Sequence, residues 1–281
     1  MTTAEIFLHE DKLIAVSPEG QSASLPLATM FDKLLAQRVD TGDLLLPPGV
    51  KTVQSRGRTT IFVIERPPAL YNFKWIAHDS GSRFGAGTSY RQVTIALPYL
   101  VVLAVFTTGE GGRFTLASNS NECFFRNEPL RKLDDELCYP ALLNCSKFRV
   151  QEGHPLVWIC TQYLDRSFDA EQELNGRVRG GIKSLLHCLL ETGFNYSSEA
   201  HEGSSWFTES RNVDPRVACV EAWQEASLQD RFFPLSVPWL KTGHSLRQVI
   251  DRIFKNLRAA EPTVRTAADL ARMVFNHAPS T

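Results

Sequence analysis

The pattern of apolar and polar positions divides the chain into a β-rich first half and a helical second half. Residues 5–16 alternate in polarity on either side of a polar turn, which predicts a β-hairpin. Residues 24–37 place leucine and phenylalanine at helical spacing behind Ser24, a favourable N-cap residue, and this pattern predicts a helix. The N-terminal segment is therefore expected to contain two strands followed by one helix.

The strongest strand signals follow in one continuous region. Four strands are predicted, at residues 50–54, 59–65, 70–77 and 90–107. The first two flank a turn sequence at residues 56–58 that is typical of a hairpin, and the fourth is bent at Pro98 before it turns into residues 113–118. Joined in order by turns, these segments predict an antiparallel four-strand meander. Since helices flank the meander, the predicted fold class is α+β.

The second half of the chain carries helical patterns separated by loops. Helices are predicted at residues 177–192, 214–228, 245–260 and 267–275. Residues 234–243 are expected to be extended or looped. A polar and aromatic stretch at residues 195–214 marks the predicted boundary. Residues 1–198 are therefore expected to form an α+β core, and residues 199–281 a helical extension packed on it.

Composition and charge exclude several classes of protein. The 281 residues are 43% hydrophobic and 22% charged, which is ordinary for a globular domain and not for a disordered chain. The net charge of −1 gives no overall attraction to nucleic acid or to an anionic membrane. The longest apolar run, residues 93–106, is shorter than the ~20 residues that span a bilayer. No signal peptide is recognised, so a cytoplasmic protein is expected.

The cysteines and carboxylates show no metal-binding pattern. The six cysteines include no CxxC pair, which favours free thiols in a reducing compartment over disulfides. The gaps between Cys123, Cys138, Cys145 and Cys160 match no zinc pattern, so no metal or cofactor is predicted. The acidic run at residues 134–136 is expected to be a solvated loop, and a divalent-cation site or a contact with a basic partner is the alternative.

Cys160 is the strongest candidate for chemistry. It ends the apolar, strand-like run at residues 156–160, and a thiol at the end of a strand can be exposed and reactive. Asn144, His154 and Tyr163 are nearby side chains that could orient or activate it. The alternative is a small buried hydrophobe, which is the usual fate of a free cysteine. No GxSxG motif of a serine hydrolase and no GK[ST] phosphate loop competes with it.

Five short stretches carry a family resemblance. They read LLLPPGV (44–50), VIERPP (63–68), ALPYLVVLAVF (96–106), RNEPLRKLDDELCYPALLNCS (126–146) and GFNYSS (193–198). With the order of the predicted elements, they resemble the ubiquitin-conjugating enzyme fold, and more closely its divergent bacterial members such as the protein B family of PRTRC plasmid systems. The resemblance covers roughly residues 6–198 and leaves residues 199–281 unexplained.

This resemblance implies thioester chemistry. Cys160 would accept the C-terminal acyl group of a ubiquitin-like protein from an activating enzyme and pass it to an amine. Asn144 would stabilise the oxyanion as a neutral amide donor, and His154, between the two in sequence, completes the candidate site. The implied partners are a ubiquitin-like protein and an activating enzyme, encoded nearby on a bacterial mobile element.

A non-catalytic scaffold or assembly subunit with the same core is the alternative function. It stays open because residues 142–144 read Leu-Leu-Asn where the family has His-Pro-Asn. Such a subunit would bind other protein subunits through its C-terminal region, which is rich in aromatic residues. These are Trp206, Phe207, Trp223, Phe232, Phe233 and Trp239. Aromatic side chains at this density fill a core more often than an interface.

Overall fold

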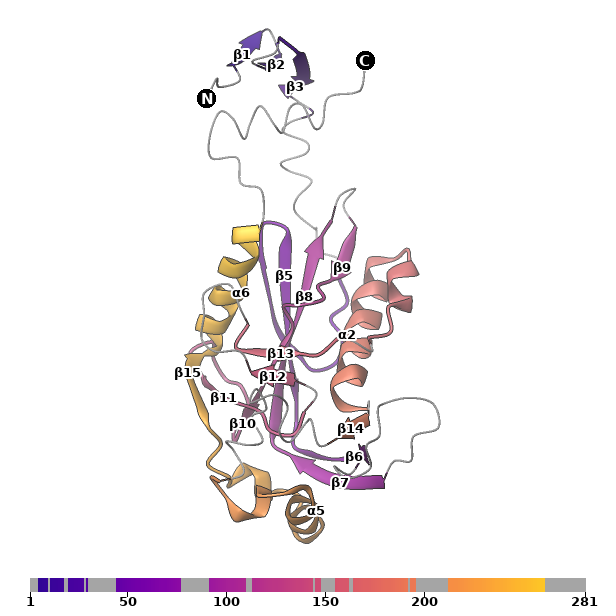
Figure 1. Cartoon of the computed structure of the whole chain (residues 1–281), viewed down its shortest axis with the longest axis vertical. Helices are drawn as coiled ribbons and strands as arrows, with labels where there is room; N and C mark the ends of the chain where they lie inside the picture. Colours follow the sequence, from indigo (N-terminus) through magenta and orange to yellow (C-terminus); the bar gives the residue numbers. More distant parts are fainter. Residues whose placement is uncertain are drawn as a thin grey trace.

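The computed structural model describes the chain in segments. The described residues are 5–9, 11–17, 20–27, 29, 44–76, 91–109, 113–143, 145–147, 155–161, 164–191, 193–195 and 212–260. Within them the strands form three sheets, of three, nine and three strands (Figure 1). With helices packed around a curled antiparallel main sheet, the predicted α+β class is confirmed in its coarse form.

The N-terminal sheet is a three-stranded antiparallel meander. Its strands are β1 (Glu5–His9), β2 (Lys12–Val16) and β3 (Ser22–Pro26). The pairing of β1 with β2 confirms the predicted hairpin. The helix predicted at residues 24–37 is wrong at its start, because residues 24–26 belong to β3 and pair with β2. Leu25 packs with Ala15 in a small apolar cluster, so alternation along the strand outweighs the N-cap signal. Most of the remaining predicted helix lies outside the described residues.

The main sheet has nine strands, and β8 lies at its centre. The strands along its path β12-β13-β10-β8-β5-β4 are β4 (Val50–Arg56), β5 (Thr59–Arg66), β8 (Tyr99–Thr108), β10 (Glu122–Arg126), β12 (Cys145–Lys147) and β13 (Val157–Ile159). Off this path, β9 (Phe114–Leu116) pairs with β8, and β11 (Glu136–Cys138) joins β10 to β15 (Lys241–Ser245). Residues 100–106 of β8 are all fully buried, so this strand forms the middle of the core.

Two strands of the main sheet continue past proline residues into a third sheet. Its strands are β6 (Ala69–Ile76), β7 (Arg91–Leu97) and β14 (Gly193–Asn195), with β14 parallel to β6. β5 pairs with β8 up to Arg66, and β6 pairs with β7 from Ala69. The ladder is interrupted at Pro67-Pro68 and at Pro98, because proline has no N–H to donate. Figure 1 shows the ribbon bending there, so that β7 runs across the direction of β8.

The sequence predicts most of these strands, but it does not predict all of the pairs that they form in the sheets. The β4–β5 hairpin is confirmed, and so is the buried face of β6, where Phe73 and Trp75 are inside. The strand predicted at residues 90–107 is two strands separated at Pro98. β5 pairs with β8 and not with β6, because the proline bend carries the chain out of the main sheet and back. The short strands β10 to β12 are absent from the prediction.

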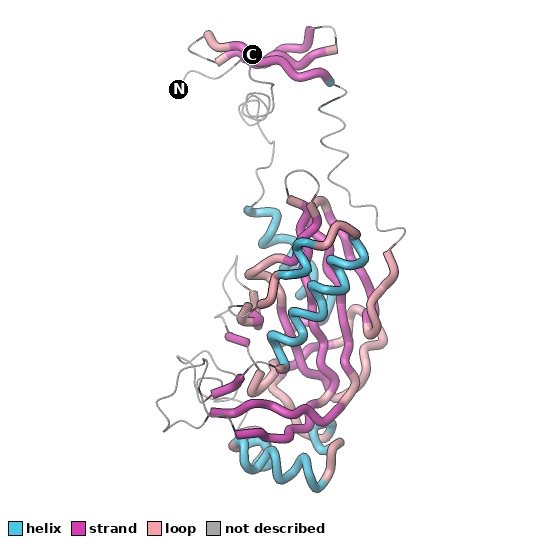
Figure 2. The backbone as a smooth tube through the Cα atoms, turned by 90° about the vertical axis from the view of Figure 1, so that its right-hand side faces the viewer, coloured by secondary structure: helices cyan, strands magenta, loops and turns pink. Residues whose placement is uncertain are grey.

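Helices flank the main sheet. The described helices are η3 (Ser167–Ala170), α2 (Leu174–Leu190), η5 (Pro215–Val217), α5 (Val220–Gln229), η6 (Phe233–Leu235) and α6 (Leu246–Ala260). Figure 1 shows α2 and α6 on opposite sides of β5 and β8, and Figure 2 shows α2 lying over the strands. The helices predicted at residues 177–192 and 245–260 are confirmed as α2 and α6. No helix in the described part of the chain is long and apolar enough to cross a membrane.

The helix predicted at residues 214–228 is divided. Asp214 caps η5, and Cys219 then adopts an extended backbone and caps α5 with its sulfur. The segment predicted as extended, residues 234–243, contains part of η6 and most of β15. The last predicted helix, at residues 267–275, lies outside the described residues.

α5 covers the open edge of β7 with polar side chains. Gln224 accepts a hydrogen bond from the N–H of Thr94 at 3.1 Å. Ser227 accepts one from the N–H of Ala96 at 2.8 Å, and Trp223 Nε1 donates to the carbonyl oxygen of Ala96 at 2.8 Å. Because an open strand edge invites pairing with other chains, α5 protects β7 in place of a further strand.

Two glycines of α2 differ sharply in the space around them. A Cβ on Gly180 would lie 2.6 Å from Phe168 Cβ, whereas a Cβ on Gly176 would lie 3.3 Å from Glu171 Oε2 and 3.6 Å from Glu171 Cβ, which are far milder contacts. We expect Gly180→Ala to lower the free energy of unfolding by about 1–3 kcal/mol through overpacking. The matched control, Gly176→Ala, should raise it by up to about 1 kcal/mol through helix propensity. Urea denaturation measures both, and equal stability of the two variants would refute the close packing of η3 on α2.

Candidate functional site

A short hairpin in the main sheet leads into the predicted nucleophile. β12 pairs with β13 so that Cys145 lies opposite Ile159. β13 in turn pairs with β10, and the N–H of Ile159 donates to the carbonyl oxygen of Asn121 at 2.9 Å. Cys160 is the first residue after β13. The hairpin therefore fixes the backbone immediately before the thiol.

Cys160 lies between the sheet and α2 and is half-buried. The thiol of Cys188, on α2, donates to the carbonyl oxygen of Cys160 at 3.1 Å. The next residue, Thr161, donates through its hydroxyl group to the carbonyl oxygen of Ser118 at 2.8 Å. These contacts hold the backbone on two sides while the residue stays partly accessible, which a reactive thiol requires.

The structure describes one of the three predicted site residues. Asn144 and His154 lie outside the described residues. Cys145, which follows Asn144 in the chain, begins β12 and is described. The roles predicted for Asn144 and His154 therefore stay predictions.

Glu122 is a buried carboxyl group that was not among the predicted site residues. It lies in β10 opposite Trp158 of β13 and is fully buried. Its Oε2 accepts hydrogen bonds from the N–H groups of Leu156 and Val157, at 3.0 and 3.1 Å. Its Oε1 has no hydrogen-bond partner among the described residues. Burial, opposed by those two N–H groups and by the charge of Arg252, raises the pKa of Glu122 to about 7. Glu122 could have been predicted from the sequence, because it is a charged residue directly beside the apolar run of β10.

None of the six cysteines forms a disulfide, as their spacing predicts. Burial, reinforced by a hydrogen bond with the thiol of Cys145, raises the pKa of Cys123 well above its ordinary value. Burial also raises the pKa of Cys138 to about 11. Thiols with raised pKa values stay protonated at neutral pH and are poor nucleophiles. Neither Cys123 nor Cys138 therefore competes with Cys160.

The acidic run at residues 134–136 ties separate elements together. Its carboxylates pair with three different cations: Asp134 with Arg247, Asp135 with Arg126 and Glu136 with Lys241. A hydrogen bond from Arg247 lowers the pKa of Asp134. Since each carboxylate has its own partner, the three do not converge on a cation. No group of three or more His, Cys, Asp or Glu side chains in the described segments could hold a metal ion.

Comparisons with models of protein families, with curated proteins and with solved structures find no match for this chain. The geometry around Cys160 and the chain's own residues are therefore the basis for assigning a function.

Proposed function

We propose that the chain is an acyl transferase of the ubiquitin-conjugating kind, in which Cys160 carries a ubiquitin-like protein as a thioester. The observation that carries this proposal is the position of Cys160, which is half-buried and is the first residue after β13. Cys145 and Ile159 form a pair, and they are the chain neighbours of Asn144 and Cys160.

The role proposed for Asn144 is the stabilisation of an oxyanion. When the Cys160 sulfur attacks a carbonyl carbon, negative charge develops on the carbonyl oxygen, close to the sulfur. The side-chain amide of Asn144, the residue before β12 in the sequence, would donate to that oxygen, and a preorganised donor of this kind lowers the barrier to acyl transfer.

The reaction consists of two acyl transfers. The Cys160 thiolate attacks the thioester between the ubiquitin-like protein and the activating enzyme, a new C–S bond forms, and the enzyme's cysteine leaves as a thiolate. An amine then attacks the Cys160 thioester, the amide bond forms, the amine loses a proton, and the Cys160 thiolate leaves. His154, which precedes Cys160 by six residues in the sequence, would accept or return the thiol proton.

The order of the elements also supports the proposal. β4, β5, β8 and β10 are neighbours in that order, and the β6–β7 ribbon only extends the β5–β8 hairpin. α2 follows Cys160 after η3, and a Cβ on its Gly181 would lie 2.9 Å from the Phe106 ring of β8. We infer from this order the finer fold implied by the resemblance, a four-strand array of β4, β5, β8 and β10 followed by the cysteine and a helix; β6 and β7, which the predicted meander included, lie in the third sheet.

Differences in thiol reactivity test the assignment. We expect iodoacetamide to modify Cys160 at least about tenfold faster than Cys123 and Cys188, because a partly accessible thiol reacts before thiols that are fully buried. Timed alkylation of the native chain followed by peptide mass spectrometry measures all three rates at once. If Cys160 reacts as slowly as Cys188, it is a structural thiol and the proposal fails.

A further inference from the structure

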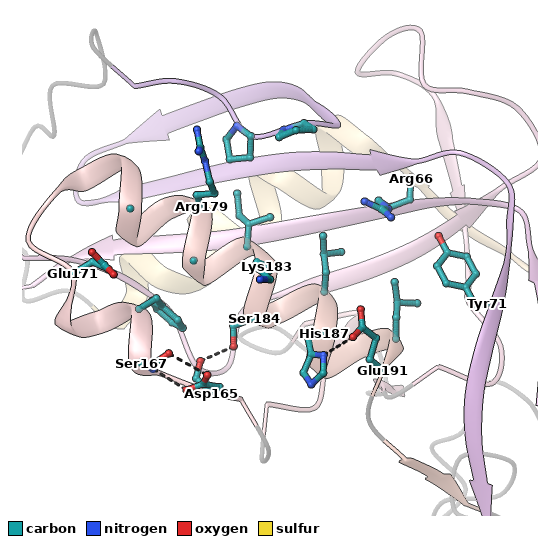
Figure 3. A pocket seen from close by; sticks show the side chains of 18 residues that line it. Arg66, Tyr71, Asp165, Ser167, Glu171, Arg179, Lys183, Ser184, His187 and Glu191 are labelled. Atoms are coloured by element: carbon teal, nitrogen blue, oxygen red, sulfur yellow. Dashed lines mark hydrogen bonds and ion pairs between the residues drawn. The ribbon is translucent and has the colours of Figure 1, made fainter. Parts of the chain in front are cut away.

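An open groove of about 810 Å³ runs along α2. α2 and η3 form one side, and residues 47–48 with Arg66 and Tyr71 of β5 and β6 form the other (Figure 3). At the N-terminal end of α2, Asn175 accepts a hydrogen bond from the N–H of Leu45 at 2.9 Å. This bond fastens the segment before β4 to the helix, so both sides of the groove are held in place.

Three basic side chains line the groove without an acidic partner. They are Arg66, Arg179 and Lys183, and none of them forms a hydrogen bond or an ion pair with another described residue. Arg179 and Lys183 are four residues apart and therefore lie on the same face of α2, ~6 Å apart along its axis. All three residues are exposed. The groove thus has a stripe of positive charge available to a ligand.

Three acidic side chains also line the groove, of which Asp165 and Glu191 have hydrogen-bond partners within it, while Glu171 adds a further negative charge. Asp165 accepts hydrogen bonds from the N–H and the hydroxyl group of Ser167, at 2.9 and 3.0 Å. Glu191 pairs with His187 at 2.7 Å, and Figure 3 shows both contacts along one rim of the groove. Negative charge on this rim repels a polyanion such as nucleic acid, while the basic stripe still attracts isolated carboxylates.

The groove also has an apolar component. Ile182 and Leu190 of α2 are buried beneath it, and Leu186 and Tyr71 are half-buried at its sides. Apolar surface beside separated cations suits a peptide better than a free phosphate, which needs donors that converge on one point. α2 has 17 residues. At ~1.5 Å per residue this helix is long enough to lie beside seven or eight residues of extended chain.

We propose that this groove binds an extended acidic segment of a partner protein, with acidic side chains on Arg66, Arg179 and Lys183 and apolar side chains against Leu186 and Tyr71. The binding does not depend on the chemistry of Cys160. It should therefore be the same in the native chain and in Cys160→Ser.

Fluorescence anisotropy of a labelled eight-residue peptide of alternating glutamate and leucine tests the proposal. The full chain should bind this probe, and the double variant Arg179→Glu/Lys183→Glu should weaken binding by about tenfold or more, because like charges now face the peptide. The matched control, Arg131→Glu/Arg231→Glu, changes two exposed cations outside the groove and should bind as the native chain does, apart from a small loss that salt removes.

Three results would overturn the proposal. One is the absence of binding when the chain is present at about 1 mM, because a dissociation constant above this value is too weak for a specific peptide complex. Another is equal weakening in the groove and control variants, which would mean attraction to overall charge only. The last is displacement of the probe by inorganic phosphate with a dissociation constant equal to that of the peptide, which would mean that the groove is a site for a small anion. Circular dichroism of Arg179→Gln/Lys183→Gln, which should also lose affinity, separates a folding defect from a lost contact.

Discussion

The native chain is expected to lose stability as the pH rises from 5 to 8, and the Glu122→Gln variant is expected to keep its stability over the same range. The native free energy of unfolding should fall by about 2–3 kcal/mol over this range, and that of the variant should not. Glu122 is fully buried, and burial raises its pKa to about 7 from an ordinary value of 4.5. The folded state therefore holds the proton more tightly than the unfolded state does.

The direction of the pH effect follows from this difference. Below about pH 4.5 the carboxyl group is protonated in both states, and its contribution to stability is fully present. As the pH rises towards 7, the unfolded chain ionises freely, while the folded chain must either keep the proton or bury a charge, so stability is lost. Glutamine keeps an oxygen that can accept from Leu156 and Val157 and has no charge to bury.

Urea denaturation at several pH values measures this effect. The matched control is Glu225→Gln, which removes an exposed carboxylate from α5 and should keep the native pH dependence. If Glu122→Gln loses as much stability as the native chain between pH 5 and 8, the buried carboxyl group is not the cause. Loss of the pH dependence in the control as well would point to overall charge.

Regular periodicity is what made elements predictable from the sequence. α6 buries Leu246, Val249, Ile250 and Ile253 at helical spacing, and β6 buries Phe73 and Trp75 at alternate positions. In both elements one face is buried, so the spacing of apolar residues in the sequence matches the spacing of buried residues in the structure. Short strands such as β11 and β12, of three residues each, have too few positions to show a period.

Other features depended on contacts between distant residues. The pairing of β5 with β8 arises where prolines break two strands at matching places, which no single stretch of sequence displays. The division of the helix at residues 214–228 depends on Cys219, whose sulfur accepts from the N–H of Ala222 at 3.4 Å. Cysteine is not among the usual N-cap residues, so the signal was absent.

The aromatic residues of the C-terminal region bear on the alternative function. Trp223, Phe233 and Trp239 are 0%, 2% and 3% exposed, and they fill the core beside β7 and β10. Among the described aromatic residues of this region, Phe232 is the exposed one, at 46%. Trp206 and Phe207 lie outside the described residues. The described aromatic side chains therefore support the fold more than they offer a surface for other subunits.

The candidate site was predictable only in part. Cys160 follows an apolar run, and that run is β13, which places the thiol at the exit from the sheet. Glu122 was missed because its importance comes from Leu156 and Val157, which are distant in sequence and reach it only through the pairing of β10 with β13.

Loss of the Cys160 thiol is expected to abolish thioester formation on the chain. The probe is ubiquitin carrying a C-terminal thioester with a small thiol leaving group, which needs no activating enzyme. The Cys160 thiolate attacks the thioester carbonyl and the small thiol leaves, so the adduct has the same type of bond as the donor. Cys188→Ser is the matched control, because Cys188 is buried on α2 and a serine hydroxyl group can still donate to the carbonyl oxygen of Cys160.

Gel electrophoresis of the chain after incubation with this probe, with and without a reducing thiol, tests the assignment of Cys160 most directly. We expect an adduct of the native chain and of Cys188→Ser that a reducing thiol removes, and either no adduct or a thiol-resistant ester for Cys160→Ser. A thiol-sensitive adduct that persists in Cys160→Ser, or no adduct on the native chain, would contradict the role of Cys160 as the nucleophile.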